Sequence, residues 1–142
     1  MTIRRAKLTD YKALIPLLND FVGEDRYSRC GDDSFKKVLK SKDNYIYVAQ
    51  LPKTGIIGFA TFSVRLVVRY PRPIAELDEL YVAPAFRRQG IATKLLNTII
   101  VKAKKLSCHR IYIGSGLKRQ SAHKLYEKNG FIVHGYHFVK NL

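Results

Sequence analysis

The sequence predicts one α/β domain, built as a mixed sheet with helices on both faces. Three observations predict it. The chain has 142 residues, enough for one domain and too few for two. Hydrophobic residues make up 46% of it, which is enough to bury a core. Strand-like and helical periodicities alternate in the order β-α-α-β-β-β-α-β-α-β, a pattern typical of helices packed on a sheet.

The first part of the chain is expected to hold two helices and four strands. Thr9 or Asp10 can cap a helix that continues to about Val22. Asp32 begins a second, short helix that runs through about Lys40. Runs of β-branched, aromatic and apolar residues predict four strands, at Thr2–Lys7, Tyr45–Ala49, Ile56–Val68 and Ile74–Val82.

The second part is expected to hold two helices and two or three strands. An apolar stripe from Ile91 to Leu106 predicts the clearest helix, with lysines on its solvent side. Gln120–Asn129 predicts a last helix that stops at Gly130. Strands are expected at Arg110–Ile113 and, as one or two pieces, at Phe131–Val139.

The composition excludes several classes of protein. Two cysteines, Cys30 and Cys108, exclude a disulfide scaffold and a four-cysteine zinc site, and the four histidines show no metal-ligand spacing. No apolar run approaches the roughly 18 residues of a membrane span. The basic start of the chain is not followed by an apolar stretch, so we expect no secretion signal and a soluble, cytoplasmic protein without a bound metal.

The charge is strongly unbalanced. The chain has 26 lysines and arginines against 11 acidic residues, a formal net charge of +15. A field of that sign attracts nucleic acid, anionic membrane surfaces and phosphorylated small molecules alike. The charge alone therefore predicts an anionic partner and does not choose among these classes.

One segment has the pattern of a phosphate-binding turn. The predicted strand ending at Val82 is followed by a short basic loop and a helix start, in which Arg87, Gly90 and Ala92 form an Arg-x-x-Gly-x-Ala pattern. The first amides of a helix have no helical partner and carry partial positive charge. Gly90 leaves room for close approach, so the segment suits a pyrophosphate. The alternative is an ordinary basic loop before a helix.

Together with other stretches, this segment resembles the GNAT superfamily of acetyl-CoA-dependent N-acetyltransferases. The order of elements agrees with that family. Four stretches resemble its conserved blocks: the Leu-Tyr-Val-x-Pro approach at residues 80–84, the stripe at residues 91–106, the Ala-His-x-x-Tyr-Glu-Lys-x-Gly-Phe-like block at residues 122–131, and the Ile-Gly-Phe-Ala opening at residues 57–60. The resemblance covers most of the chain from residue 44 onward.

The resemblance implies a mostly antiparallel sheet whose fourth and fifth strands splay apart around acetyl-CoA. The cofactor-binding backbone would be that of Leu80, Tyr81 and Val82 for the pantetheine arm, and that of Arg88, Gln89, Gly90, Ile91, Ala92 and Thr93 for the pyrophosphate. Arg87, with Arg88, would add positive charge there. The Val82 amide would contact the thioester carbonyl. Tyr126 would protonate the leaving thiolate. Arg119 replaces an asparagine that many members use, and could bind a CoA phosphate instead.

Three carboxylates are candidates for the base that deprotonates the amine. The resemblance places Glu76 where several branches have a base, and Asp78 with Glu79 where polyamine-type members have an acidic pair. Strand alternation puts Glu76 and Asp78 on one face and Glu79 on the other, unless a bulge shifts the register. Direct and water-relayed deprotonation both remain open, and surface ion pairs are the alternative role for at least one of the three.

The acceptor is expected to be a primary amine. Glu24, Asp25 and Tyr27 lie in the loop that lines the acceptor side in the family, and with Asp78 they would bind a small amine, a polyamine, an aminoglycoside or a lysine-rich peptide. Neither cysteine lies in a motif, so we expect direct attack without a covalent enzyme intermediate. The charge leaves two alternatives: an acceptor that is a ribosomal protein or aminoacyl-tRNA, or a non-catalytic nucleic-acid-binding module. A homodimer is plausible, and no membrane partner is expected.

Overall fold

The computed structural model describes residues 1–29 and 31–142. Cys30, which we expected to be a thiol without a catalytic role, lies outside the described residues. The chain forms two compact units, Met1–Tyr112 and Ile113–Leu142, and each is described by itself. In the part of the chain that is described, no helix is long and apolar enough to cross a membrane.

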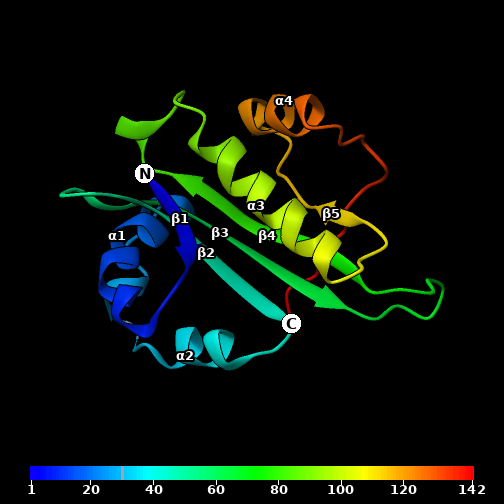
Figure 1. Cartoon of the computed structure of the whole chain (residues 1–142), viewed down its shortest axis with the longest axis horizontal. Helices are drawn as coiled ribbons and strands as arrows, with labels where there is room; N and C mark the ends of the chain where they lie inside the picture. The colour runs from blue at the N-terminus through cyan, green and yellow to red at the C-terminus, as the bar shows by residue number, and fades with distance from the viewer. Residues whose placement is uncertain (30) are drawn as a thin grey trace. The chain divides into compact units, whose positions relative to one another are not determined.

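Five strands form one sheet in the order of the chain, as Figure 1 shows. They are β1 (Thr2–Arg5), β2 (Asn44–Leu51), β3 (Gly55–Arg65), β4 (Ile74–Val82) and β5 (Ile111–Ile113). The first four pair antiparallel. The Ala75 amide donates to the Arg110 carbonyl at 3.0 Å, and the His109 amide to Pro73 at 2.7 Å, so β5 begins beside the start of β4 and runs parallel to it. The predicted mixed sheet is confirmed.

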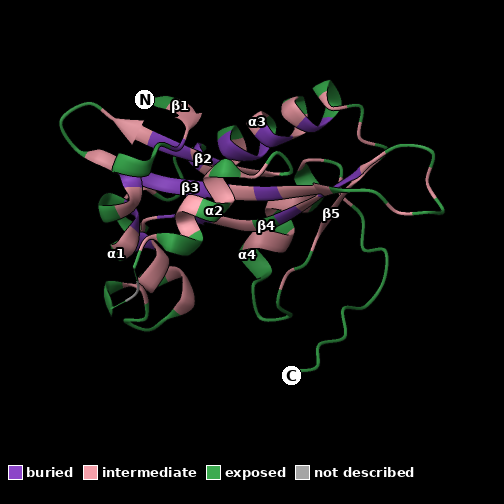
Figure 2. Ribbon diagram, turned by 90° about the horizontal axis from the view of Figure 1, so that it is seen from below, coloured by how far each residue is buried: buried purple, intermediate pink, exposed green. Residues whose placement is uncertain are grey.

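Helices cover both faces of the sheet in the first unit. They are α1 (Tyr11–Val22), α2 (Asp33–Lys40) and α3 (Ile91–Lys105), with short 3-10 turns η1 (Leu8–Asp10), η2 (Tyr27–Arg29) and η3 (Pro84–Phe86). Seen along the sheet, α3 lies on one side of the strands and α1 with α2 on the other (Figure 2). The predicted helix pattern is correct, because each helix carries an apolar stripe that the sheet can bury.

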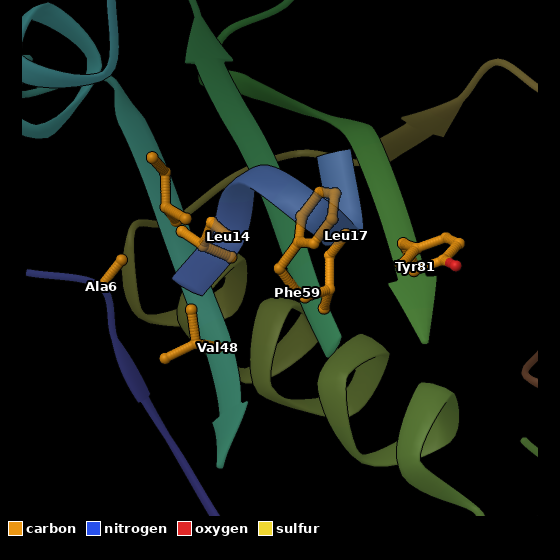
Figure 3. Packing of buried hydrophobic residues seen from close by; sticks show 7 residues of the cluster. Ala6, Leu14, Leu17, Val48, Phe59 and Tyr81 are labelled. Atoms are coloured by element: carbon orange, nitrogen blue, oxygen red, sulfur yellow. The ribbon is translucent and has the colours of Figure 1, made fainter. Parts of the chain in front are cut away.

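A hydrophobic core lies between the sheet and the helices α1 and α2. Buried side chains from β2, β3 and β4 meet leucines of α1 there, as Figure 3 shows: Ala6, Leu14, Leu17, Ile46, Val48, Phe59 and Tyr81. Phe21 packs edge-on against the rings of Phe59 and Tyr81, with centroids 6.0 and 6.1 Å away. These contacts fix the end of β4 against α1.

The second unit holds helix α4 (Gln120–Lys128). Gly130 follows it with φ +83°, the left-handed conformation expected after a helix. The prediction of one or two strands at Phe131–Val139 is wrong, because residues 131–142 contain no strand. A strand needs a partner ladder, and here the side chains of Val133, Phe138 and Val139 are 90% or more exposed. The β-branched and aromatic pattern therefore misled the prediction.

Candidate active site

A β-bulge in β4 sets the geometry of the candidate site. Thr61 of β3 faces Glu79, but the next residue, Phe62, faces Leu77, so Asp78 has no opposite partner. One extra residue in a strand shifts the alternation of side chains beyond it. The bulge brings the side chains of Asp78 and Glu79 to one cavity, whereas strict alternation would place them on opposite faces. The predicted alternation held only in the absence of a bulge, and the structure has a bulge at Asp78.

The cavity lies in the first unit, between the helices α1 and α2 and the strands β2, β3 and β4. It has a volume of about 320 Å³, within the range of small-molecule sites. Four rings line it on this face of the sheet: Tyr11, Tyr27, Phe35 and Phe59. The Tyr45 ring stacks on Phe62 and lies 5.3 Å from the Lys102 Nζ of α3, on the opposite face. Tyr27, predicted from the sequence to contact the acceptor, is therefore in position to do so.

The two carboxylates differ in their surroundings. Glu79 accepts a hydrogen bond from the Thr61 hydroxyl at 2.5 Å. Asp78 accepts a longer one, 3.3 Å, from Ser63, and water still reaches its side chain. Partial burial, and then the negative charges of Glu76 and Glu79, raise the pKa of Asp78 to about 6. A carboxyl with that pKa is mostly ionised at neutral pH and can still take up a proton.

Glu76, the other candidate base, is in a different environment. It forms an ion pair with Arg65, whose guanidinium nitrogen lies 3.0 Å from a carboxylate oxygen of Glu76, and the Arg65 side chain is 54% exposed. Glu76 is not among the described residues that line the cavity. A surface ion pair was the alternative role considered for at least one of the three candidate acids, and Glu76 forms one.

The acids of the loop between α1 and α2 are engaged locally. Glu24 pairs with Arg26, and Asp25 accepts a hydrogen bond from Asn19 at 2.9 Å. Neither carboxylate is among the described cavity-lining residues. Their assignment to acceptor binding stays a prediction, and the negative charge of the cavity comes from β4.

The turn from β4 into α3 leaves a run of amides open. The first helical hydrogen bond of α3 is from the Lys94 amide to Gly90 at 3.1 Å, and no side chain caps the helix. Among the described residues, the amides of residues 88–93 donate to no other group. Gly90 has φ +76°, and a Cβ added there would meet nothing within 4 Å. An anion can therefore approach these amides closely.

Two arginines shape this turn. The Arg87 Nε donates to the Val82 carbonyl at 2.9 Å, and its guanidinium lies 5.4 Å from the centre of the Tyr81 ring. These contacts fasten the turn to the end of β4. Arg88 has φ +62°, a left-handed conformation that is uncommon for a residue with a side chain.

The end of β4 has amides that do not pair with β3. The Ala83 amide donates to Ile57 at 2.9 Å, and Gly58 faces Val82. Because hydrogen-bonded and non-hydrogen-bonded pairs alternate in an antiparallel ladder, the amides of Leu80 and Val82 point away from β3. On that side β5 has three residues beside the start of a nine-residue strand. The end of β4 thus extends beyond β5 and can pair with an extended ligand.

Two residues expected at the site belong to the second unit. Burial raises the pKa of the Tyr126 hydroxyl, partly offset by the positive charge of Arg119. The Tyr126 ring packs edge-on against Phe131, with centroids 6.1 Å apart. The functional roles of Tyr126 and Arg119 stay predictions. Within residues 1–29 and 31–142, no group of histidine, cysteine or acidic side chains is suited to a metal ion.

Sequence reasoning missed the polar partners and most of the rings of the cavity. Thr61 and Ser63 matter only because β3 pairs with β4 in this register, which no local pattern reveals. The rings of Tyr11 and Phe35 are tilted against each other with centroids 5.2 Å apart, and they come from two helices. The amphipathic faces of α1 and α2 were the available signal, and they indicate burial without showing that a cavity remains.

Comparison with known proteins identifies the family of this chain. The model of the acetyltransferase (GNAT) family matches residues 11–131. The aminoalkylphosphonate N-acetyltransferase of Salmonella typhimurium is 23% identical over 140 residues, which cover 99% of this chain and 90% of that enzyme. An uncharacterized N-acetyltransferase of Methanocaldococcus jannaschii is 29% identical over 98 residues, but these span 68% of this chain and 43% of the archaeal protein.

Solved structures show the same fold. A protein described as a transcriptional regulator from Bacillus halodurans superposes with a TM-score of 0.89, at 26% identity and over 99% of both chains. An aminoglycoside 6'-N-acetyltransferase from Acinetobacter haemolyticus superposes with a TM-score of 0.80, at 25% identity, over 100% of this chain and 99% of that one. Since the family model matches most of the sequence and the fold agrees, the chain belongs to the acetyltransferase (GNAT) family.

Proposed function

We propose that this protein transfers the acetyl group of acetyl-CoA to a primary amine. The proposal rests on one observation: β4 contributes both to the cavity and to the turn with open amides. Its bulge presents Asp78 and Glu79 to a cavity, and its end leads into the turn whose amides at residues 88–93 are open. One strand thus joins an amine-binding cavity to an anion-binding turn. Named N-acetyltransferases among the relatives support the activity.

The open turn suits the diphosphate of CoA. Uncapped amides at a helix start bind phosphate by hydrogen bonding and through the helix dipole. The edge of Leu80–Val82 suits an extended arm, which would pair with it as a short extra strand. Bound acetyl-CoA supplies a reactive thioester, and the Val82 amide would donate to its carbonyl oxygen as negative charge develops there.

We assign the base to the cavity carboxylates, with Asp78 first. An alkylamine has a pKa of about 10.4 and is protonated at neutral pH, so it must lose a proton before it attacks. Asp78, whose pKa is raised to about 6, takes that proton directly or through water. The amine nitrogen then forms a bond to the acetyl carbon, the carbon–sulfur bond breaks, and the nitrogen gives up its second proton to water. Tyr126 would return a proton to the thiolate.

Acetyl-CoA consumption, measured across a series of amines, tests the proposal. Asp78→Asn should lower kcat/KM by about 10²- to 10⁴-fold, the usual contribution of a general base. Glu76→Gln is the matched change on the same strand and should alter kcat/KM by less than about threefold. The opposite order would assign the base to Glu76. Calorimetry that shows no heat with CoA would overturn the proposed function altogether.

A further inference from the structure

The lining of the cavity carries more information than the reaction type. Asp78 and Glu79 are the charged side chains among the described residues that line it. The chain has 26 lysines and arginines, yet none of the lining residues is basic. An acceptor with a phosphonate or carboxylate group would therefore bury a negative charge without a cation to pair with, which is costly.

A second positive charge on the acceptor would also lack a partner. Three acids between α1 and α2 already have partners: Glu24 pairs with Arg26, Asp25 with Asn19, and Asp32 with Lys36 at 2.7 Å. Both cavity carboxylates come from adjacent positions on β4. They can hold one ammonium group between them, while a polyamine or an aminoglycoside carries several.

Apart from Gly31, Ser34, Asn44 and Thr61, the rest of the lining is apolar or aromatic. Rings from α1, α2 and β3 face the cavity together with Leu14, Leu18 and Val38. Burial of apolar surface is the main source of affinity in such a site. At about 30 Å³ for each water molecule, 320 Å³ corresponds to on the order of ten waters, and so to an acceptor with a similar number of non-hydrogen atoms.

We propose that the acceptor is a primary monoamine with a compact apolar body, of the arylalkylamine class. This inference rests on the proposed function and names its substrate class. The ammonium group lies between Asp78 and Glu79, and the ring lies among Tyr11, Tyr27 and Phe35. Proton removal at the carboxylate end leaves the amine facing the end of β4. Hydroxyl-rich acceptors lose hydrogen bonds to water on entry, and the lining has few polar side chains to replace them, because Asn44 and Thr61 already have partners in Ser41 and Glu79.

A panel of five acceptors tests the assignment at saturating acetyl-CoA. The panel holds phenethylamine, putrescine, aminomethylphosphonate, kanamycin and a short lysine peptide. The value of kcat/KM for phenethylamine should exceed that of each other acceptor by about tenfold or more, since a charge or polar group left unpaired on the acceptor costs binding energy. A higher value for any of the other four overturns the inference and leaves the proposed function standing.

A designed variant tests whether polyamines are poor acceptors because the cavity has no carboxylate for a second ammonium group. Ser34 lines the cavity at the start of α2, where an acidic residue is compatible with the helix. Ser34→Asp should raise the putrescine-to-phenethylamine ratio of kcat/KM by about tenfold. Lys37→Ala, an exposed change on the same helix and not among the cavity-lining residues, should leave the ratio unchanged. An unchanged ratio in Ser34→Asp overturns the inference.

Direct binding separates the two proposals. Calorimetry with phenethylamine and the protein alone should show binding that Asp78→Asn weakens. Binding without turnover would overturn the proposed function and support the assignment of the cavity. Turnover of other amines without phenethylamine binding would support the proposed function and overturn the assignment of the cavity. Failure of both measurements overturns both proposals.

Discussion

At the scale of the residue, Asp78 is balanced between opposing neighbours. Partial burial and the charges of Glu76 and Glu79 raise its pKa, while the Ser63 hydrogen bond and the positive charge of Arg65 lower it. The result, a pKa of about 6, places the change of charge just below neutral pH. A base with this pKa is active in its ionised form, so activity should be lost as the pH falls through that value.

The pH profile tests this role. We expect kcat/KM to fall about tenfold for each unit of pH below 6 and to level off above it. Glu76→Gln removes a negative charge that raises the pKa of Asp78, so the inflection should move to lower pH. Asp78→Asn should abolish the inflection. A wild-type profile that is flat between pH 5 and 8 would contradict the assignment of Asp78 as the base.

A second residue-scale feature concerns stability. Asp10 is 8% exposed and accepts two hydrogen bonds from the Arg4 guanidinium, at 2.7 and 2.9 Å, and one from the Lys7 amide at 2.7 Å. The bonds from Arg4, more than any other contact, lower the pKa of Asp10. A lowered pKa means that the carboxylate stabilises the fold above its ordinary value of 3.8 and loses that effect as the pH falls through the folded-state pKa.

Removing this charge should destabilise the protein measurably. Asp10→Asn leaves the Arg4 guanidinium with a neutral partner and should lower the free energy of unfolding by about 1–3 kcal/mol in urea at pH 7. Asp20→Asn, an exposed change on α1, should cost less than about 0.5 kcal/mol. The difference between the two variants should shrink towards pH 3. Equal effects at pH 7 would show that the Arg4–Asp10 pair contributes nothing.

At the scale of the element, β3 and β4 are held unusually close at Gly58. A Cβ added to Gly58 would lie 2.7 Å from the Tyr81 carbonyl oxygen and 3.3 Å from a methyl group of Val82. The Tyr81 oxygen belongs to the backbone, so it cannot turn aside as a flexible side chain can. Gly58 therefore sets the position of the strand end that carries the Val82 amide.

Gly58→Ala should disturb both the fold and the cofactor edge. We expect a loss of about 1–3 kcal/mol in the free energy of unfolding, typical of overpacking. We also expect a rise in KM for acetyl-CoA that exceeds the rise in KM for the amine, because the shift falls on the end of β4. Gly116→Ala, where an added Cβ meets nothing within 4 Å, is the matched control. A change in stability alone would limit Gly58 to a structural role.

The elements themselves were largely predictable from the sequence, whereas the bulge that shapes the cavity was not. Ile74–Val82 is a strand at the predicted bounds, because Pro73 and Pro84 flank a stretch in which apolar residues recur at strand spacing. The bulge at Asp78 depends on the register between two strands, which local patterns do not contain. The loop acids Glu24 and Asp25 looked like acceptor ligands, yet short-range partners engage them. Local periodicity thus predicts elements, while pairing between elements builds the cavity.

At the scale of the whole molecule, the net charge of +15 and the acidic cavity serve different ligands. A positive field attracts the phosphates of CoA over distances set by the ionic strength. It opposes the approach of a cationic amine, which the carboxylates of β4 must attract at short range. The same field would attract nucleic acid, so the charge alone does not separate an acetyltransferase from an RNA-binding module.

Salt dependence separates them. The screening length falls from about 10 Å at 0.1 M salt to about 3 Å at 1 M, so KM for acetyl-CoA should rise several-fold over this range. S-acetylpantetheine has the same thioester without the phosphates and should show a KM that hardly changes. Turnover should proceed in nuclease-treated protein. If turnover instead requires RNA, and RNA affinity falls steeply with salt, the +15 charge serves nucleic acid and the small-molecule acceptor is wrong.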